Sequence, residues 1–172
     1  AQTYSSNVVG YVNVDLVPGW NLIANPLDAG EANTLDLVTA PVGSSAYKMV
    51  NGAYQIAVRS TDELGDYWDP WDITFEPGEG LFVNIAGTEP VTVTFVGECV
   101  VGNHSIDLPA GWSLVGNPIP TAGAIVDGID TLGLDGAVAP GDAIYFFDSA
   151  TQSYNIYSRS SDDSGEYWDP YD

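Results

Sequence analysis

The sequence predicts an all-β fold of two tandem small β-sandwich or barrel repeats, the second of which lacks its C-terminal strands. Three observations lead to this prediction. Apolar residues alternate with other residues over short stretches, Gly, Pro and Asn punctuate these stretches as turn formers do, and two blocks of sequence occur twice. Blocks that recur along a chain are typical of one structural unit used repeatedly.

The two repeated blocks stand at different spacings. VVGYVNVDLVPGWNLIANP at 8–26 aligns without a gap on 100–118, at an offset of 92 residues. YQIAVRSTDELGDYWDPWD at 54–72 aligns on 154–172, at an offset of 100. The difference of eight residues (100 − 92) falls in a Gly-, Ala- and Asp-rich stretch, where a loop lengthens at small entropic cost. The predicted parts are an N-terminal extension, a first repeat and a second, incomplete repeat, at 1–7, 8–99 and 100–172.

Within the first repeat, most of the elements are predicted as strands. The alternating pattern at 8–16 predicts a strand with one apolar face. Asn51-Gly52 predicts a two-residue hairpin, because both positions of such a turn need a positive φ. GWNLIANP and GWSLVGNP predict a core tryptophan in each repeat, Trp20 and Trp112, followed by an Asn-Pro strand end. We expect further strands at 72–75, 80–85 and 91–98, and helical turns at 31–38 and at its counterpart 124–132.

Charge excludes several classes of partner. The chain has 24 acidic residues against Lys48, Arg59 and Arg159, and its formal net charge is −21. Nucleic acid and anionic membranes bind through Lys and Arg, so we expect neither as a partner. We also expect no membrane insertion, because no apolar run approaches about 18 residues. Cys99 is the single cysteine, so an internal disulfide is impossible.

No group of residues predicts catalysis. His104 stands where the first copy has Val12, so it belongs to no repeated constellation, and Cys99 has no nearby base. We therefore expect that the protein is not an enzyme and that it needs no cofactor for catalysis.

An acidic block is kept in both copies, although Asp and Glu exchange within it. Three interpretations stay open. The first is a calcium site, because Ca²⁺ takes carboxylate and carbonyl oxygens, and the second is a pair of solvated turns in which Arg59 and Arg159 each pair with a carboxylate. The third is a subunit or glycan contact through the aromatic cluster of each copy, Tyr67, Trp68 and Trp71 and their counterparts Tyr167, Trp168 and Tyr171. The candidate metal ligands are Asp62, Glu63, Asp66, Asp69, Asp72, Asp162, Asp163, Glu166, Asp169 and Asp172.

The second copy has no counterpart of 73–98, which in the first copy holds three predicted strands. A sheet without those neighbours exposes unpaired backbone groups, and such an edge is a template for another chain. The extension before Val8 occupies the place that 92–98 holds before Val100. We therefore expect it to act as a donor strand for a neighbouring molecule; its residues are Ala1, Gln2, Thr3, Tyr4, Ser5, Ser6 and Asn7. Two alternatives stay open at this point: a processing end, and a chain that continues beyond residue 172.

The motifs NVVGYVNV, GWNLIANP, YWDP, PGEGLFVNI and VTFVGE together resemble a group of secreted, mostly uncharacterised β-repeat proteins of Verrucomicrobia and related bacteria. The resemblance covers nearly the whole chain and implies a β-rich unit exported from a bacterium, with no implied activity. The start AQTYSS fits a mature chain after signal peptide removal, so we expect an extracellular location.

These observations favour a structural subunit of an extracellular filament or sheath. Assembly is expected head to tail, by addition of the N-terminal strand to the incomplete second repeat of a neighbour. The partner is then a second copy of the same chain. The alternative is a secreted carbohydrate-binding or adhesive module, calcium-dependent in one version, with a glycan as its partner.

Overall fold

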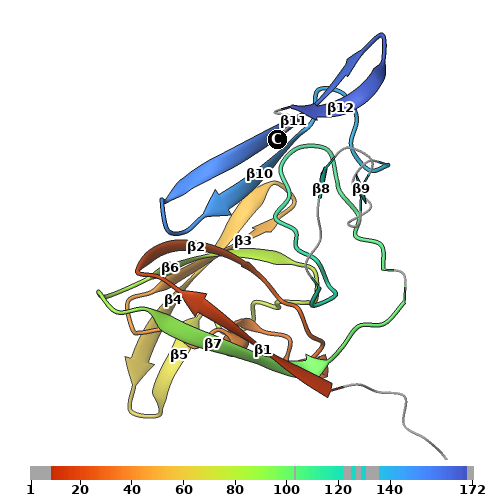
Figure 1. Cartoon of the computed structure of the whole chain (residues 1–172). Coiled ribbons are helices and arrows are strands. Elements are labelled where there is room, and N and C mark those ends of the chain that lie inside the picture. Colours follow the sequence, from red (N-terminus) through yellow and green to blue (C-terminus); the bar gives the residue numbers. More distant parts are fainter. Residues whose placement is uncertain (1–8, 103, 122–124, 127–128, 131–135, 170–172) are drawn as a thin grey trace, which may run out of the picture. The chain divides into compact units, whose positions relative to one another are not determined.

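The computed structural model describes 9–102, 104–121, 125–126, 129–130 and 136–169, and it divides the chain into two compact units, Ala1–Pro120 and Thr121–Asp172. Regular structure is nearly all antiparallel β, which confirms the predicted all-β class (Figure 1).

The first unit is a sandwich of two antiparallel sheets. The larger sheet has five strands, in the spatial order β2 (Gly19–Ala24), β6 (Gly80–Ile85), β3 (Ser45–Val50), β4 (Ala53–Asp62) and β5 (Gly65–Asp69). The smaller sheet pairs β1 (Val9–Leu16) with β7 (Val91–Glu98). The two sheets enclose one hydrophobic core, which includes Leu16, Trp68, Phe75, Leu81 and Phe95.

The strand β6 occupies an interior place in the larger sheet because its side chains are apolar on both faces. Every residue of GLFVNI except Asn84 is buried. A strand that is buried on both faces reads as a continuous apolar run, which is what the sequence shows. It hydrogen-bonds to β2 on one side and to β3 on the other.

The hairpin between β3 and β4 confirms the turn prediction. Asn51 and Gly52 have φ values of 52° and 77°, as a two-residue turn between right-twisted strands requires. Val50 and Ala53 close the hairpin as opposite residues.

Trp20 and Trp112 do not anchor cores, so that prediction is wrong. Along β2 the inward positions belong to Asn21 and Ile23, and Trp20 therefore faces outward and is exposed. The buried tryptophan of the first unit is Trp68, from the second repeated block. Its indole Nε1 donates a hydrogen bond to the Val38 carbonyl at 3.1 Å.

Two short segments also differ from expectation. The stretch 72–75 makes an isolated bridge between Thr74 and Thr34 instead of a strand, because its backbone is tied to two short 3₁₀ turns, η1 (Gly30–Ala32) and η2 (Leu35–Leu37). Those turns confirm the helical turns expected at 31–38. The prediction of a helical turn at the counterpart, 124–132, is wrong for the residues that the structure describes there, because β8 (Ile125–Val126) pairs with β9 (Ile129–Asp130). Asp127-Gly128, a hairpin dipeptide, stands between them in the sequence.

The second unit contains a three-stranded antiparallel sheet in the order β10 (Ala143–Asp148), β11 (Ser153–Asp162) and β12 (Gly165–Asp169). Its register repeats that of β3, β4 and β5. Arg59 lies opposite Trp68 in the first unit, and Arg159 lies opposite Trp168 in the second. The two arginines also donate equivalent backbone hydrogen bonds, to Ser44 and Asp142.

The division into compact units falls 21 residues after the end of the first repeat (120 − 99), because the start of the second repeat packs on the first unit. The Gly80 amide donates to the Leu114 carbonyl at 3.0 Å, and the Gly116 amide donates to the Gly78 carbonyl at 2.9 Å. A Cβ at Gly116 would stand only 2.0 Å from the Ala24 Cβ, so this approach requires glycine.

Candidate functional site

The segment at 101–118 repeats the sequence of β1 and β2, yet it forms no strand in its described residues, 101–102 and 104–118. In the first repeat β1 pairs with β7 and β2 pairs with β6. The 172 residues hold no second copy of those two partner strands. The same sequence pattern therefore forms two strands where β6 and β7 pair with it, and in the described part of the second copy it forms one isolated bridge, between Val115 and Glu79.

Apolar side chains of this segment are exposed as a result. Leu16 at the end of β1 is 1% exposed, whereas its counterpart Leu108 is 39% exposed. Val115 is exposed where its counterpart Ile23 is buried. We call 101–108 the acceptor segment, because it repeats the strand that β7 covers in the first repeat.

Local turn chemistry in the second copy is intact. Asn25 accepts a hydrogen bond from the Leu27 amide through Oδ1 at 3.1 Å, and Asn117 accepts one from the Ile119 amide at 3.0 Å. The Asn-Pro turn thus forms in both copies. The residues just before this turn pair with the first unit through a single isolated bridge, between Val115 and Glu79, instead of through a strand.

The strand β10 is at the edge of its sheet. Its counterpart β3 is interior, with β4 on one side and β6 on the other. In the described part of the second unit, β10 has β11 as its strand neighbour. Phe146 stands at the register position of Lys48, opposite Asn155 as Lys48 is opposite Gln55.

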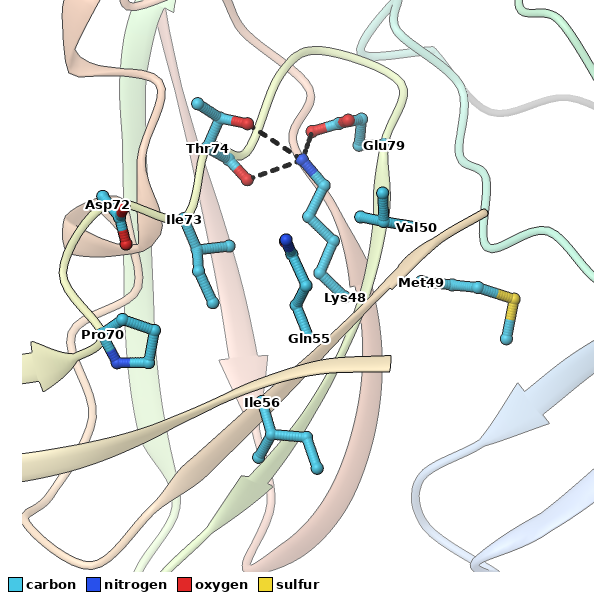
Figure 2. Close-up of a pocket in the computed structure, with 10 residues that line it drawn as sticks. All are labelled: Lys48, Met49, Val50, Gln55, Ile56, Pro70, Asp72, Ile73, Thr74 and Glu79. Atoms are coloured by element: carbon cyan, nitrogen blue, oxygen red, sulfur yellow. Dashed lines mark hydrogen bonds and ion pairs between the residues drawn. The ribbon is translucent and has the colours of Figure 1, made fainter. Parts of the chain in front are cut away.

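In the first unit, Lys48 ties β3 to the loop that leads into β6 (Figure 2). Its buried ammonium contacts the Glu79 carboxylate at 2.7 Å, the Thr74 carbonyl at 2.9 Å and the Thr74 hydroxyl at 3.0 Å. These groups line an open pocket of about 580 Å³. Three oxygen atoms engage the ammonium group, so the pocket offers a ligand no free positive charge from Lys48.

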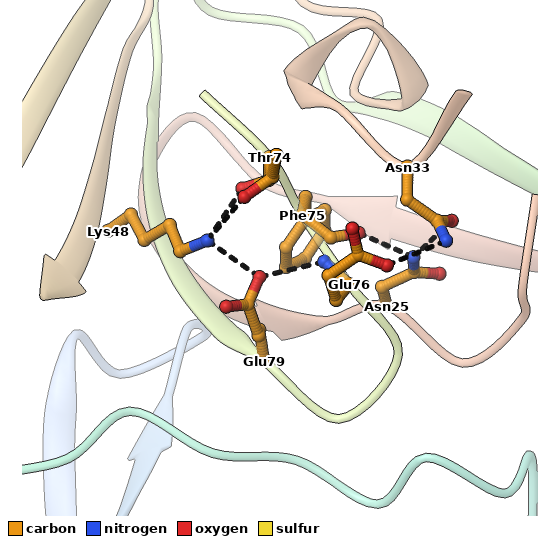
Figure 3. Close-up of polar contacts among 7 residues, drawn as sticks. All are labelled: Asn25, Asn33, Lys48, Thr74, Phe75, Glu76 and Glu79. Atoms are coloured by element: carbon orange, nitrogen blue, oxygen red, sulfur yellow. Dashed lines mark hydrogen bonds and ion pairs between the residues drawn. The ribbon is translucent and has the colours of Figure 1, made fainter. Parts of the chain in front are cut away.

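A second polar cluster holds the same loop from the opposite side (Figure 3). Asn25 Nδ2 donates to the Phe75 carbonyl at 2.7 Å and to Asn33 Oδ1 at 3.2 Å. Asn33 Nδ2 donates to the carboxylates of Glu76 at 2.9 Å and Asp28 at 2.8 Å. These contacts organise the loop before β6, the part of the first repeat that has no second copy.

The Asp28 carboxylate is held in its ionised form within that cluster. The Gly30 amide, which donates to it at 2.8 Å, is the main cause of a lowered Asp28 pKa, and the Asn33 amide adds to it. Burial opposes the shift.

The acidic block does not gather into a cation site among the residues that the structure describes. No group of three or more His, Cys, Asp or Glu side chains is close enough there to hold a metal ion. The carboxylates are exposed, and Asp66 and Asp69 on β5 point to opposite faces of the sheet because they are three residues apart. Asp172 lies outside the described residues, and calcium binding stays a prediction.

The two arginines each lie over a tryptophan and near a carboxylate. Arg59 is 3.8 Å from Asp36 and its guanidinium lies 5.7 Å from the centre of the Trp68 ring. Arg159 is 3.5 Å from Glu166 and 5.3 Å from the Trp168 ring. Arg159 thus pairs with a carboxylate of the acidic block, whereas the carboxylate near Arg59 belongs to η2.

Of the predicted contact residues, Trp168 is 3% exposed, and the Arg159 guanidinium lies over its ring. Tyr167 is half-buried, and Tyr171 lies outside the described residues. The donor segment Ala1 to Asn7 also lies outside them. The missing counterpart of 73–98 predicts from the sequence that the acceptor segment lacks the partner of β1. Its irregular backbone is seen only in the structure.

A glycan partner stays a prediction, and two pairs that each join a half-buried and an exposed tyrosine are packed edge to face. Tyr47 and Tyr54 meet edge to face at 85°, and Tyr145 and Tyr154 do so at 82°. Such pairs satisfy one another as packed aromatic contacts, whereas a sugar platform presents ring faces to the ligand.

Comparison with protein-family models, with curated proteins and with solved structures found no match for this chain. Among the described residues, no helix has the length and apolar character needed to cross a membrane.

Proposed function

We propose that this protein is a structural subunit of an extracellular filament or sheath. Subunits join head to tail when the N-terminal extension of one molecule adds as a strand to the second repeat of the next. The observation that carries the proposal is the acceptor segment, which has the sequence of a strand, no strand partner in its described residues, and exposed apolar side chains. Strand addition supplies the missing backbone partner.

The pairing of β1 with β7 provides the register for this contact. Val9 lies opposite Glu98, and Val12 lies opposite Phe95. The offset of 92 residues is added to each β1 residue to find its counterpart in the acceptor segment, and subtracted from each β7 residue to find its counterpart in the extension. Val101 then lies opposite Ser6 of the neighbour (98 − 92), and His104 lies opposite Thr3 (95 − 92).

The same register determines which residues of the extension face inward and which face outward. Ala1 and Thr3 take the inward places of Val93 and Phe95, while Gln2 and Tyr4 take the outward places of Thr94 and Val96. The donor therefore fills the position of β7 with small side chains. It leaves the place of β6 beside β10 for another strand.

A contact of this type is heterologous, because donor and acceptor are different surfaces of one molecule. Such contacts extend into a filament unless the rotation between subunits closes a ring. Each molecule carries one donor and one acceptor, which gives linear growth.

Removal of residues 1–7 from the 172-residue chain tests the proposal. Sedimentation velocity and negative-stain electron microscopy should find filaments for the full chain and only monomers or short oligomers for the deletion variant. Filaments of unchanged length in the deletion variant would refute strand exchange.

A paired substitution tests the register as well as the contact. Thr3→Phe restores the large inward side chain that β7 has at Phe95, and burying it should lower the critical concentration for assembly about tenfold. Gln2→Phe is the matched control, because it adds the same ring on the outward face. Equal effects of the two substitutions would contradict the proposed alternation.

A further inference from the structure

The pocket beside Lys48 lies entirely within the first unit, where residues of β3, of β4 and of the loop at 70–79 line it (Figure 2). Its volume of about 580 Å³ is in the range of sites that bind small molecules. The charged groups of its lining are the Lys48 ammonium and the carboxylates of Asp72 and Glu79. The lining groups that the protein leaves without partners indicate the chemistry of a ligand.

The free polar groups of this pocket are mostly hydrogen-bond acceptors. Among the described residues, the Asp72 carboxylate and the Gln55 side-chain amide have no hydrogen-bond partner. Glu79 uses Oε2 twice, for the Lys48 ammonium and for the Glu76 amide, at 2.7 Å each, and its Oε1 accepts no bond from the described residues. A ligand must therefore donate hydrogen bonds, and Gln55 Nε2 can donate one in return.

The charges of the pocket favour a cation and disfavour an anion. The Lys48 side chain is 8% exposed and three oxygen atoms engage its ammonium group, so an anion finds no available positive charge. Asp72 is exposed, and no ion pair within the described residues neutralises it. Figure 2 shows Asp72 and Glu79 on opposite sides of Gln55. A positive group of the ligand therefore belongs beside Asp72, away from the Lys48 ammonium.

Apolar surface accompanies these polar groups. Pro70 and Ile73 line the pocket near Asp72, and Val50 lines it from the hairpin. Trp71 stands between two lining residues in the sequence and is 75% exposed, which makes it the most exposed aromatic side chain of the described residues. A sugar ring suits such a site, because it has an apolar C–H face and hydroxyl groups that both donate and accept hydrogen bonds.

We propose that this pocket binds an amino sugar. The ammonium group of the sugar pairs with Asp72, its hydroxyl groups donate to Glu79 Oε1 and exchange hydrogen bonds with the Gln55 amide, and its C–H face packs on Trp71. Acidic sugars do not fit, because the Lys48 ammonium is already engaged and the chain carries a formal charge of −21. The inference does not depend on strand addition, since every residue of the site belongs to the first repeat.

Titration of the full 172-residue chain with four probes, followed by two-dimensional NMR, tests the ligand class. The probes are D-glucosamine, D-glucose, D-glucuronate and ethylamine, used at about pH 6, where the amines are protonated, and in about 150 mM NaCl, which screens the general attraction of an acidic chain for cations. D-Glucosamine should shift the Gln55 side-chain amide and the Ile73 backbone amide. It should bind at least about tenfold more tightly than D-glucose, which lacks the charge, and than ethylamine, which lacks the ring. D-Glucuronate should not bind.

Substitutions at and away from the pocket test the residues. Asp72→Asn should weaken D-glucosamine binding about tenfold, because it removes the charge that pairs with the ammonium group. Asp62→Asn is the matched control, since it removes the same charge at the opposite end of β4 from Gln55, and it should leave binding unchanged. Trp71→Ala should weaken D-glucosamine binding but not that of ethylamine, a difference that a simple cation site would not show.

Urea unfolding midpoints close to that of the parent are expected for all three variants, because the substituted side chains are exposed. Equal affinities of Asp72→Asn and Asp62→Asn for D-glucosamine, or shifts confined to residues outside the pocket, would overturn the proposal. D-Glucose that binds as tightly as D-glucosamine would mean a neutral glycan instead, and ethylamine that does so would mean a general cation site; either result also overturns it.

Discussion

Lys48 links β3 to the loop before β6, and its substitution is a test of that link. Lys48→Met removes the buried ammonium and leaves Glu79 without its ion-pair partner, which should lower the free energy of unfolding by about 2 kcal/mol. Because Glu79 is partly exposed, the loss should be smaller than for a fully buried pair. Urea denaturation measures it. The double variant Lys48→Met/Glu79→Gln should recover part of the loss, and a Lys48→Met protein as stable as the parent would contradict the role of this contact.

The Asp28 carboxylate predicts a dependence of stability on pH. Its pKa in the folded state lies below the ordinary value of 3.8, chiefly because of the Gly30 amide. The ionised group therefore stabilises the fold fully above the unfolded-state pKa, and this contribution is lost as the pH falls through the lower folded-state pKa. Asp28→Asn should flatten the fall of the unfolding midpoint below about pH 4. A curve parallel to that of the parent would argue against it.

Sequence patterns located the repeated tryptophans but not their roles. GWNLIANP and YWDP both carry a tryptophan in a short apolar context, and nothing in their composition says which one is buried. In the structure the strand parity decides: Asn21 satisfies turn groups at Val17 and Gly19 and so faces inward, which turns Trp20 outward. Trp68 is inward because it lies opposite Arg59 on the covered face.

For the elements, Gly116 tests how the start of the second repeat is held on the first unit. Gly116→Ala should disrupt the backbone contact with Gly78, because the new Cβ would overlap that of Ala24. Hydrogen exchange of the Gly80 and Gly116 amides should then accelerate. Gly136→Ala is the control, since no atom lies within 4 Å of a Cβ at that position. Unchanged exchange in Gly116→Ala would contradict a fixed docking of this segment.

Hairpins could be predicted from the sequence, whereas the state of 101–118 could not. Asn51-Gly52 encodes its own turn within two residues, so local chemistry is sufficient. The acceptor segment has the same local pattern as β1, but whether it is a strand depends on a partner far away in the sequence. Long-range pairing of this kind has no local sequence signature. The sequence predicts the missing partner only through the comparison of the two repeats, because the second has no counterpart of 73–98.

At the scale of the molecule, composition and repetition predicted the all-β class correctly because both are properties of the whole sequence. The boundary between compact units was less accessible. It lies after Pro120, since backbone hydrogen bonds from Gly80 and Gly116 attach the first residues of the second repeat to the first unit. These hydrogen bonds join backbone atoms and require close approach at glycines. An alignment of the two repeats does not reveal them.

The formal charge of −21 predicts that assembly depends on ionic strength. Raising NaCl from about 10 mM to about 150 mM shortens the Debye length from about 30 Å to about 8 Å and weakens repulsion between subunits, so the critical concentration should fall.

Calcium separates screening from a specific site: at matched ionic strength, millimolar Ca²⁺ should lower the critical concentration no more than Mg²⁺ if the acidic turns are merely solvated. A larger effect of Ca²⁺ that Asp62→Asn and Asp162→Asn abolish would instead establish the acidic block as a calcium site. Light scattering across titrations of NaCl, Ca²⁺ and Mg²⁺ measures the critical concentration in each case. A critical concentration that rises with NaCl would mean that ion pairs, rather than strand addition between repelling molecules, hold the subunits together.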